Sequence, residues 1–290
     1  VCGLIALGVK RGDEIITPPN SFIASTSAIV HIGAKPVFVD VLEDQNINPY
    51  EIEKAITNKT KAIMPVHLTG RMAKMDEILK ISNKYNIPII EDAAQSIGSQ
   101  YQNKFSGSIG EVGCFSTHPL KNLNACGDGG FITTNNFEIF KKIKKLRNHG
   151  FEDRNTVTSF GYVSRMDNLQ AAILKFRLKK INEIISKRRK NADMYFKLLK
   201  KLPITLPKEN KDEFNSYHTF VIQTKQRDKL SKYLLKKGIE TAIHYPVPIH
   251  LQPASKFLRR GIGSYKVTEL QAKKILTLPI HQFLTIKDIE

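Results

Sequence analysis

Two short motifs in this sequence bring together side chains that can do chemistry. The first runs from Gly113 to Gly130: a short apolar run ends in Ser116, His-Pro follows, and Lys121 precedes a Gly-Asp-Gly-Gly segment. Most lysines only solvate a surface. Lys121 differs because it stands between a proline, which restricts the backbone, and glycines, which allow a tight turn. The backbone must pass close to another group there, so Lys121 is the first candidate functional residue.

The second motif is Glu91-Asp92-Ala93-Ala94-Gln95, which closes an apolar stretch predicted to be a strand. An acidic residue in this position often only caps a following helix. However, Ser116 also stands at the end of a predicted strand, and ligands of parallel sheets bind at the carboxyl ends of the strands. We therefore expect Asp92 and Ser116 at the edge of the sheet where a ligand binds.

The elements that must position these side chains follow from the hydrophobic pattern. Strands are predicted at residues 13–17, 36–41, 62–67, 87–92, 113–117 and 130–134. Helices are predicted at residues 21–32, with Ser21 as the N-cap, and at 49–56 and 75–85. Strands that alternate with helices at this spacing predict the α/β class, with a largely parallel sheet and right-handed crossovers.

From residue 168 the pattern changes. Residues 168–201 are strongly basic and carry apolar residues at helical spacing, which predicts a long helix that links two domains. The rest alternates between strand and helix, with segments at 218–224, 230–237, 241–245 and 270–276. The sequence thus predicts a large ligand-binding domain at residues 1–167, and a linking helix with a smaller α/β domain at residues 168–290.

Length and composition limit the classes of protein to consider. The 290 residues, 41% hydrophobic and 25% charged, are typical of a soluble globular protein with an ample core. No apolar run approaches the roughly 18–20 residues of a membrane span, and no signal peptide is visible. Three scattered cysteines without a Cys-x-x-Cys pair indicate a reducing cytoplasm. The eight histidines are dispersed, so we expect no metal site.

The net charge of +18 suggests nucleic-acid binding as one alternative. The basic residues are spread along predicted amphipathic helices, however, and no helix-turn-helix, zinc finger or aromatic RNA-binding strand pair is visible. We interpret them as a solvated surface whose positive field also attracts anionic ligands such as diphosphates. A nucleic-acid binder would instead be retained on DNA or RNA in a steeply salt-dependent way.

The two motifs together resemble the DegT–DnrJ–StrS family of nucleotide-sugar aminotransferases, which depend on pyridoxal phosphate (PLP). That family carries Ser-x-His-Pro-x-Lys followed by Gly-Glu/Asp-Gly-Gly, and the resemblance extends over essentially the whole chain. It implies the fold type I of PLP-transferases. It also implies that Lys121 is the catalytic residue that forms a Schiff base with PLP. Asp92 would face the pyridine nitrogen, where its charge keeps the ring protonated and able to store electrons.

The resemblance implies roles for five further residues, most of them with a structural alternative. Gln95 would approach the ring hydroxyl of PLP. Ser116 would hydrogen-bond the phosphate of PLP, or else only complete a turn. Phe22 would stack on the ring, or else be a core aromatic. His244 and Tyr245 lie in a segment near the substrate entrance and would contact the sugar or its phosphates, or else the histidine is only packed in a loop.

One position departs from the family pattern. The family usually has an Asn that reaches the phosphate of the neighbouring subunit's PLP, and this chain has Val163 instead. Valine cannot donate that hydrogen bond. Either the adjacent Ser164 substitutes for it, or phosphate binding across the dimer is weakened. The resemblance itself implies a homodimer, because the active sites of the family are completed by both subunits.

The implied reaction moves an amino group from an amino acid, usually glutamate, to a nucleotide-linked 3- or 4-keto-6-deoxyhexose. Lys121 would move the proton as general base and acid. Two alternatives share the fold. One is a deoxysugar dehydratase that depends on pyridoxamine phosphate (PMP), but such enzymes characteristically replace the Schiff-base lysine by histidine. The other is a non-catalytic regulatory relative, suggested by Val163 and by the start of the chain.

Both ends of the chain look interrupted. Residues 1–7 resemble the end of a helix, and residues 285–290 resemble the start of one. The family resemblance implies that a segment with a Ser-Gly-Thr phosphate loop precedes Val1. We therefore expect a fragment, and we expect it to retain the cofactor less well than a chain that carries this loop.

Overall fold

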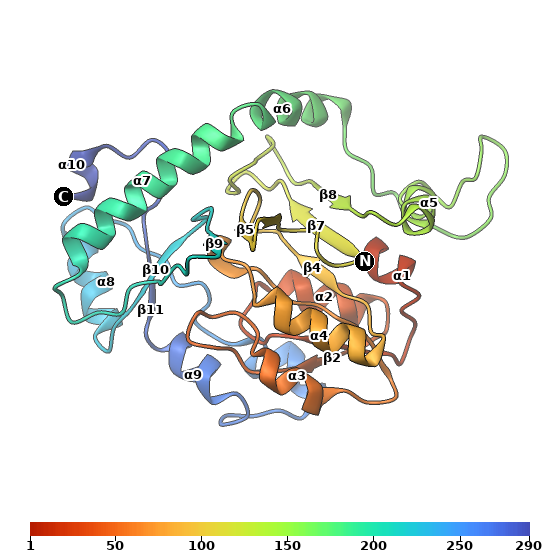
Figure 1. Cartoon of the computed structure of the whole chain (residues 1–290), viewed down its shortest axis with the longest axis horizontal. Helices are drawn as coiled ribbons and strands as arrows, with labels where there is room; N and C mark the ends of the chain where they lie inside the picture. Colours follow the sequence, from red (N-terminus) through yellow and green to blue (C-terminus); the bar gives the residue numbers. More distant parts are fainter.

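The computed structural model describes residues 1–290, and its N-terminal half is organised around one sheet (Figure 1). The strands of this sheet are β1 (Glu14–Thr17), β2 (Lys35–Phe38), β3 (Thr60–Ile63), β4 (Ile90–Asp92), β7 (Val112–Ser116) and β8 (Gly130–Thr133). Isolated parallel bridges join the β3 and β4 segments, so the order across the sheet is β2-β1-β3-β4-β7-β8. Only β8 runs antiparallel to its neighbour. The predicted α/β fold with a mainly parallel sheet is confirmed.

Helices cover both faces of this sheet. They are α1 (Cys2–Ala6), α2 (Ile23–His31), α3 (Pro49–Ala55), α4 (Met75–Tyr85) and α5 (Phe137–Leu146), with the short 3-10 helix η1 (Leu68–Gly70). Successive side chains of a strand point to opposite faces, and the buried neighbours Ile15 and Ile16 belong to two different hydrophobic clusters. One cluster includes residues of α1, α2 and α5. The second cluster includes residues of α3 and α4. β1 is therefore buried along its whole length.

The C-terminal half has its own hydrophobic cluster. Its helices and strands are α6 (Asn168–Leu178), α7 (Ile181–Leu199), β9 (Glu213–Phe214), β10 (Phe220–Gln223), α8 (Arg227–Lys236), α9 (Lys266–Ala272), β11 (Ile275–Leu278) and α10 (Ile286–Ile289). β10 pairs antiparallel with β11, and Tyr195 of α7 packs with Phe220 and Leu276 in the cluster. In Figure 1, α6 and α7 run along one side of the molecule. None of the helices is both long and apolar enough to cross a membrane.

Two of the regions where the two halves contact each other are built from secondary structure. The short strand β5 (Gln100–Tyr101) pairs with β6 (Lys104–Phe105) and also with β9. Farther along, the 3-10 helices η2 (Ile249–Leu251) and η3 (Pro253–Leu258) lead into α9, and Ile249 and Tyr265 pack against Phe38 of β2. The Asp40 carboxylate accepts hydrogen bonds from the backbone N–H groups of Val267 and Thr268, both at 2.9 Å. The domain boundary at residue 168 stays a prediction.

Two predictions about helices were wrong in detail. Ser21 does not cap α2, because Phe22 occupies the N-cap position with extended backbone and the Ser21 hydroxyl donates to the Phe22 carbonyl at 3.1 Å. The single linking helix is instead two helices, α6 and α7. The N–H of Lys180 bonds the carbonyl of Arg177, three residues back, which closes α6 and starts a new axis without disturbing the apolar spacing.

The expected strand at residues 241–245 is absent. Only Ala242 forms a bridge, to Thr277 of β11. Pro246 and Pro248 follow, and neither has an N–H to continue a ladder of hydrogen bonds. The segment predicted at 270–276 divides into the end of α9 and the start of β11. A contiguous apolar run therefore spans a helix-to-strand junction here, which periodicity alone does not reveal.

Candidate active site

Lys121 lies half-buried in the turn that follows β7. Its backbone N–H donates to the His118 carbonyl at 2.8 Å, and the Asn124 amide donates to the Pro119 carbonyl at 2.7 Å, so the turn closes on itself. The Nζ amine has no hydrogen-bond or ion-pair partner. Burial lowers the pKa of Lys121, and the charge of Asp92 opposes that effect only in part. The amine is therefore neutral and nucleophilic more readily than an exposed lysine.

Asp92 is the last residue of β4, and both oxygens of its carboxylate are held. Oδ1 accepts a hydrogen bond from the N–H of Ala94 at 3.1 Å, and Oδ2 accepts one from the Ser25 hydroxyl at 2.6 Å. Burial raises the pKa of the Cys114 thiol to about 12, and the negative charge of Asp92 adds to this effect. The charge of Asp92 also raises the pKa of Lys121, so this fixed carboxylate lies near that amine.

Tyr245 lies next to Phe22, and both Gln95 and Asp92 act on its phenol. The Gln95 side-chain oxygen accepts a hydrogen bond from the N–H of Thr69 at 2.8 Å. Burial and the charge of Asp92 raise the pKa of the Tyr245 phenol, and the Gln95 side chain opposes them. The rings of Tyr245 and Phe22 are 5.6 Å apart, and Phe22 is 55% exposed. Phe22 is therefore not the core aromatic of the structural alternative.

His244 and Ser116 occupy different surroundings. His244 Nδ1 is 2.9 Å from the Thr277 hydroxyl, and burial, with a contribution from the charge of Lys121, lowers the pKa of this histidine. Ser116 is the last residue of β7, and its hydroxyl oxygen accepts a hydrogen bond from the N–H of His118 at 3.3 Å. Ser116 therefore does complete the turn, while its hydroxyl proton stays available to a ligand.

The structure brings most of the predicted residues together. Contacts or electrostatic effects link Lys121, Asp92, Gln95, Tyr245, Phe22 and His244. Ser116 makes no hydrogen bond with these residues; it belongs to the same turn as Lys121, through the hydrogen bond from His118. No set of three His, Cys, Asp or Glu side chains is arranged to hold a metal ion.

Three residues at the site were not predicted from the sequence. Ser25 lies in the first turn of α2, three residues after Phe22, and its residue type does not reveal its contact with Asp92. Thr69, which holds Gln95, has a φ of 65°, a backbone state that its residue type does not indicate. His218 is half-buried, and desolvation, with the charge of Lys121, lowers the pKa of this histidine well below its ordinary value. No local motif marks it.

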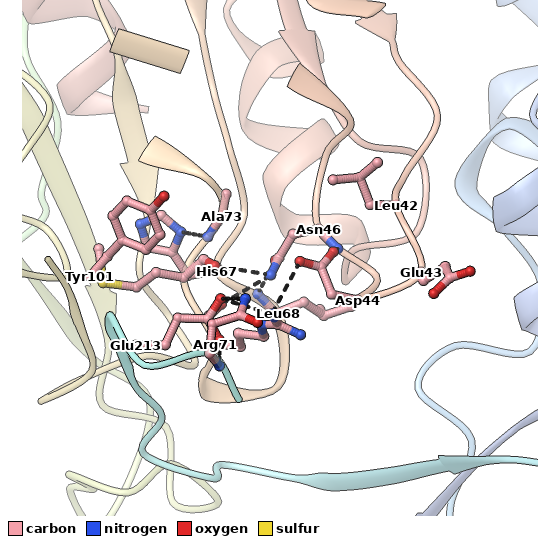
Figure 2. Close-up of polar contacts among 12 residues, drawn as sticks. Leu42, Glu43, Asp44, Asn46, His67, Leu68, Arg71, Ala73, Tyr101 and Glu213 are labelled. Atoms are coloured by element: carbon pink, nitrogen blue, oxygen red, sulfur yellow. Dashed lines mark hydrogen bonds and ion pairs between the residues drawn. The ribbon is translucent and has the colours of Figure 1, made fainter. Parts of the chain in front are cut away.

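A polar network holds the loop after β3 that includes Thr69 (Figure 2). Asn46 Oδ1 accepts a hydrogen bond from the N–H of Leu68 at 3.1 Å. The Arg71 guanidinium donates to Glu213 of β9 at 2.8 Å, and it lies 3.8 Å from Asp44. This ion pair connects the loop to the C-terminal half. The neighbouring cleft of about 380 Å³ contains Arg71 and none of the seven predicted site residues, so it is not the candidate site.

A fully buried pair, His67 and Glu91, fixes the ends of β3 and β4. His67 Nδ1 accepts a hydrogen bond from the N–H of Ala73 at 3.2 Å, so Nε2 carries the proton and donates to Glu91 at 2.8 Å (Figure 2 shows the contact with Ala73). The Glu91 carboxylate also accepts three backbone hydrogen bonds, at 2.6–2.7 Å, from residues 107, 109 and 110. These contacts fix the backbone at Glu91, and so they also fix the position of the next residue, Asp92.

The side chains of this site fit PLP by their chemistry. An unpaired amine, a fixed carboxylate and an amide are present for the aldehyde, the ring nitrogen and the ring hydroxyl: Lys121, Asp92 and Gln95. Beside Ser116, the hydroxyl of Thr117 is fully buried without a hydrogen-bond partner, and a phosphate oxygen would satisfy such a group. A Cβ at Gly129 would lie 2.7 Å from that hydroxyl, so the glycine keeps this space open.

Comparisons with known proteins identify the family of this chain. The family model described as "DegT/DnrJ/EryC1/StrS aminotransferase family" matches residues 1–290. A "pleiotropic regulatory protein" of Geobacillus stearothermophilus is 41% identical over 281 residues, which are 96% of this chain and 76% of that protein. A dTDP-3-amino-3,4,6-trideoxy-alpha-D-glucose transaminase of Streptomyces venezuelae is 39% identical over 279 residues, with 96% and 74% covered.

Solved structures show the same fold. The crystal structure of S. venezuelae DesV in complex with a ketimine intermediate superposes with a TM-score of 0.97 at 38% identity, over 99% of this chain and 78% of that one. Structures of this fold have also been solved with bound PMP cofactor and in a PLP form.

Proposed function

The chain belongs to the DegT/DnrJ/EryC1/StrS aminotransferase family, and from this premise we propose that it transfers an amino group from an amino acid to a nucleotide-linked keto-deoxysugar. It is an aminotransferase whose cofactor is PLP. Glutamate is the proposed donor. The S. venezuelae relative, named for a dTDP-linked amino sugar, supports the proposed class of acceptor.

One observation carries the proposal: the amine of Lys121 is half-buried and unpaired, near a single fixed carboxylate. A lysine that only decorated the surface would have a pKa near its ordinary value, whereas burial lowers the pKa of Lys121. A lysine kept for an ion pair would contact Asp92 directly. An amine that is easily deprotonated and has no partner is suited to attack an aldehyde.

When bound, PLP supplies an aldehyde that accepts the amino group and a ring that stores an electron pair. We propose that the Lys121 amine would hold PLP through its aldehyde carbon and would move the proton at the α-carbon of the amino donor as general base and acid. Asp92 would keep the ring nitrogen protonated. Gln95 would contact the ring hydroxyl, Phe22 would cover one face of the ring, and Ser116 would donate a hydrogen bond to the phosphate.

His244 and Tyr245 are proposed to contact the sugar or its phosphates. Both are half-buried on the C-terminal half, and Tyr245 lies against Phe22 at the mouth of the site. The net charge of +18 supports attraction of a nucleotide diphosphate, because a positive field raises the local concentration of anions.

A homodimer is the proposed assembly. Several apolar side chains are exposed in the single chain: Leu120 is 76% exposed, Val163 66% and Phe160 99%. Leu120 directly precedes Lys121, so a second copy on this surface would also shield the site from water. Phe160→Asp should shift the protein toward monomer in analytical ultracentrifugation, and an unchanged dimer would contradict this interface.

The three free cysteines support the proposal of a reducing cytoplasm.

The name of the Geobacillus relative favours one second candidate, a regulatory protein. The aminotransferase and the regulatory protein differ in whether the protein converts a substrate with the help of Lys121. The dehydratase alternative has no such support, since the chain keeps Lys121.

The test is reductive trapping followed by an activity screen. Borohydride should fix PLP to Lys121 in the unaltered protein and in a Lys142→Ala control, which loses an exposed lysine, but not in Lys121→Ala. Incubation with glutamate and a panel of nucleotide keto-sugars should yield an amino-sugar by mass spectrometry. A protein that fixes PLP but converts neither glutamate nor any sugar would favour the regulatory candidate. Absence of an adduct at Lys121 would overturn the proposal.

A further inference from the structure

The hydroxyl of Ser25 makes the strongest side-chain contact to Asp92. Ser25 is 6% exposed, and its Oγ is 2.6 Å from Asp92 Oδ2 and 3.4 Å from the carbonyl oxygen of Phe22. A hydroxyl has one proton to donate. The shorter distance and the negative charge of the acceptor both direct that proton to Asp92. The two residues are 67 positions apart in the sequence, so the fold alone creates this pair.

The place of Ser25 in α2 strengthens the contact. Phe22 is the N-cap of this nine-residue helix, and Ser25 is its third residue. The first turn of a helix carries a partial positive charge, which favours a nearby carboxylate in its ionised form. The same turn also presents Phe22 toward Tyr245. One rigid element therefore sets the position of both the proposed ring-stacking residue and the donor to Asp92.

The contacts of Asp92 leave room for a further hydrogen bond. Ala94 donates to Oδ1 and Ser25 donates to Oδ2, and each carboxylate oxygen has two lone pairs. The two donors lie on different oxygens, so together they fix the plane of the carboxylate. Without Ser25, the carboxylate would be free to rotate about its Cβ–Cγ bond, because Ala94 alone holds one oxygen.

We infer that Ser25 is a positioning residue for the proposed aminotransferase: its hydroxyl orients the Asp92 carboxylate toward the ring nitrogen of PLP. The inference rests on the proposed function. Ser25 does not react with the cofactor or the substrate, and it acts only through Asp92. It should therefore affect how tightly and in which orientation the cofactor is held, and not how well the sugar binds.

The experiment compares three variants in the full chain. Ser25→Ala removes the hydroxyl, and Ser25→Thr keeps a hydroxyl at the same position. Ser82→Ala is the matched control, because Ser82 is also 6% exposed and its hydroxyl donates at 2.7 Å, but to the backbone carbonyl of Ile87 in a region away from Asp92. Two quantities are measured on protein stripped of cofactor: the dissociation constant of added PLP, and the visible circular dichroism of bound PLP, which reports the orientation of the ring.

For Ser25→Ala, the dissociation constant of PLP should rise about two- to tenfold, the cost of immobilising on binding one side chain that Ser25 no longer holds. The visible circular dichroism should change, kcat should fall, and KM for the sugar should stay the same. Ser25→Thr should restore most of the affinity, and Ser82→Ala should resemble the unaltered protein even though its melting temperature falls.

Ser25→Ala with unchanged PLP affinity and dichroism would overturn the inference, and so would an equal loss in Ser82→Ala. Either result would leave the proposed function intact, provided that the unaltered protein binds PLP at Lys121 and forms amino-sugar. If the unaltered protein binds no PLP, the proposed function has failed first, and the inference falls with it.

Discussion

Replacing Glu91 by Gln should be among the most damaging single changes to the stability of this protein. Glu91 is 0% exposed, and its carboxylate accepts four hydrogen bonds. Glutamine has nearly the same shape, so packing is kept. However, one oxygen becomes an NH₂ group, which cannot accept. The two N–H groups that face it are then left without an acceptor in the protein interior.

The magnitude follows from the contacts that are lost. If the amide oxygen keeps the bonds from residues 109 and 110, then the N–H of Gly107 and Nε2–H of His67 are unpaired. A histidine tautomer with the proton on Nδ1 gives no relief, because Nδ1 faces the N–H of Ala73 at 3.2 Å. Two hydrogen bonds to a charged acceptor, at about 1.5–3 kcal/mol each, predict a loss of about 3–6 kcal/mol. The total free energy of unfolding of a typical domain is about 5–15 kcal/mol, so this loss would be a large share of it.

The pH dependence gives a second, independent check. Burial alone would raise the pKa of Glu91, but the hydrogen bonds from His67 and from the backbone outweigh it, so the pKa in the folded state is lowered. A carboxyl with a lowered folded pKa stabilises the protein above its unfolded pKa of about 4.3, and this contribution is lost as pH falls through the folded pKa. The difference between the two proteins should therefore be full at pH 7 and shrink at strongly acidic pH.

Urea unfolding monitored by circular dichroism measures both effects. Glu240→Gln is the control, because Glu240 is exposed, and such a surface change should stay within about 0.5 kcal/mol. A loss below 1 kcal/mol for Glu91→Gln at pH 7 would show that the buried hydrogen bonds are not as described. A difference that stays constant into acid would refute the linkage argument.

Three further predictions concern other parts of the molecule. Competitive acetylation as a function of pH should give Lys121 a titration midpoint below that of exposed lysines, since burial lowers its pKa, and a midpoint equal to theirs would contradict the site geometry. Gly150→Ala should lower the melting temperature, because Gly150 has a φ of 84° and an added Cβ would lie 1.6 Å from the Ser159 carbonyl oxygen. The expected cost is at least about 1–3 kcal/mol, and Gly261→Ala, where a Cβ meets nothing, is the control. Phe220→Ala should cost about 3–5 kcal/mol in urea unfolding because its side chain is fully buried in the C-terminal cluster, and a loss near zero would mean that this cluster is not a core.

Local patterns in the sequence predicted the alternation of strands and helices and singled out Lys121 and Asp92, while the chemistry expected of these two residues came from the family resemblance. Both residues end or follow a strand of a parallel sheet, and topology brings such positions to one edge. Phe22 was assigned through a looser motif. In the structure Phe22 is 55% exposed. The sequence does not reveal this, because an aromatic residue in the first turn of a helix can equally be part of the core.

The residues that the sequence did not indicate depend on contacts between distant segments. His218 comes near Lys121 only because the C-terminal half packs against the turn after β7. The pairing of Ser25 with Asp92 depends on how α2 packs over the sheet. Ser21 was predicted as a cap because its residue type is favoured there, but the extended backbone of Phe22 moved the start of the helix by one residue.

The tie between Asp40 and α9 has a consequence for biosynthesis. β2 is an edge strand of the sheet, and Phe38 and Asp40 obtain their cover from residues 249–268. Val267, which donates to the Asp40 carboxylate, is made 227 residues after it. While the chain emerges from the ribosome, this edge stays bare and open to pairing with other nascent chains. Products released before residue 268 should therefore aggregate or engage chaperones.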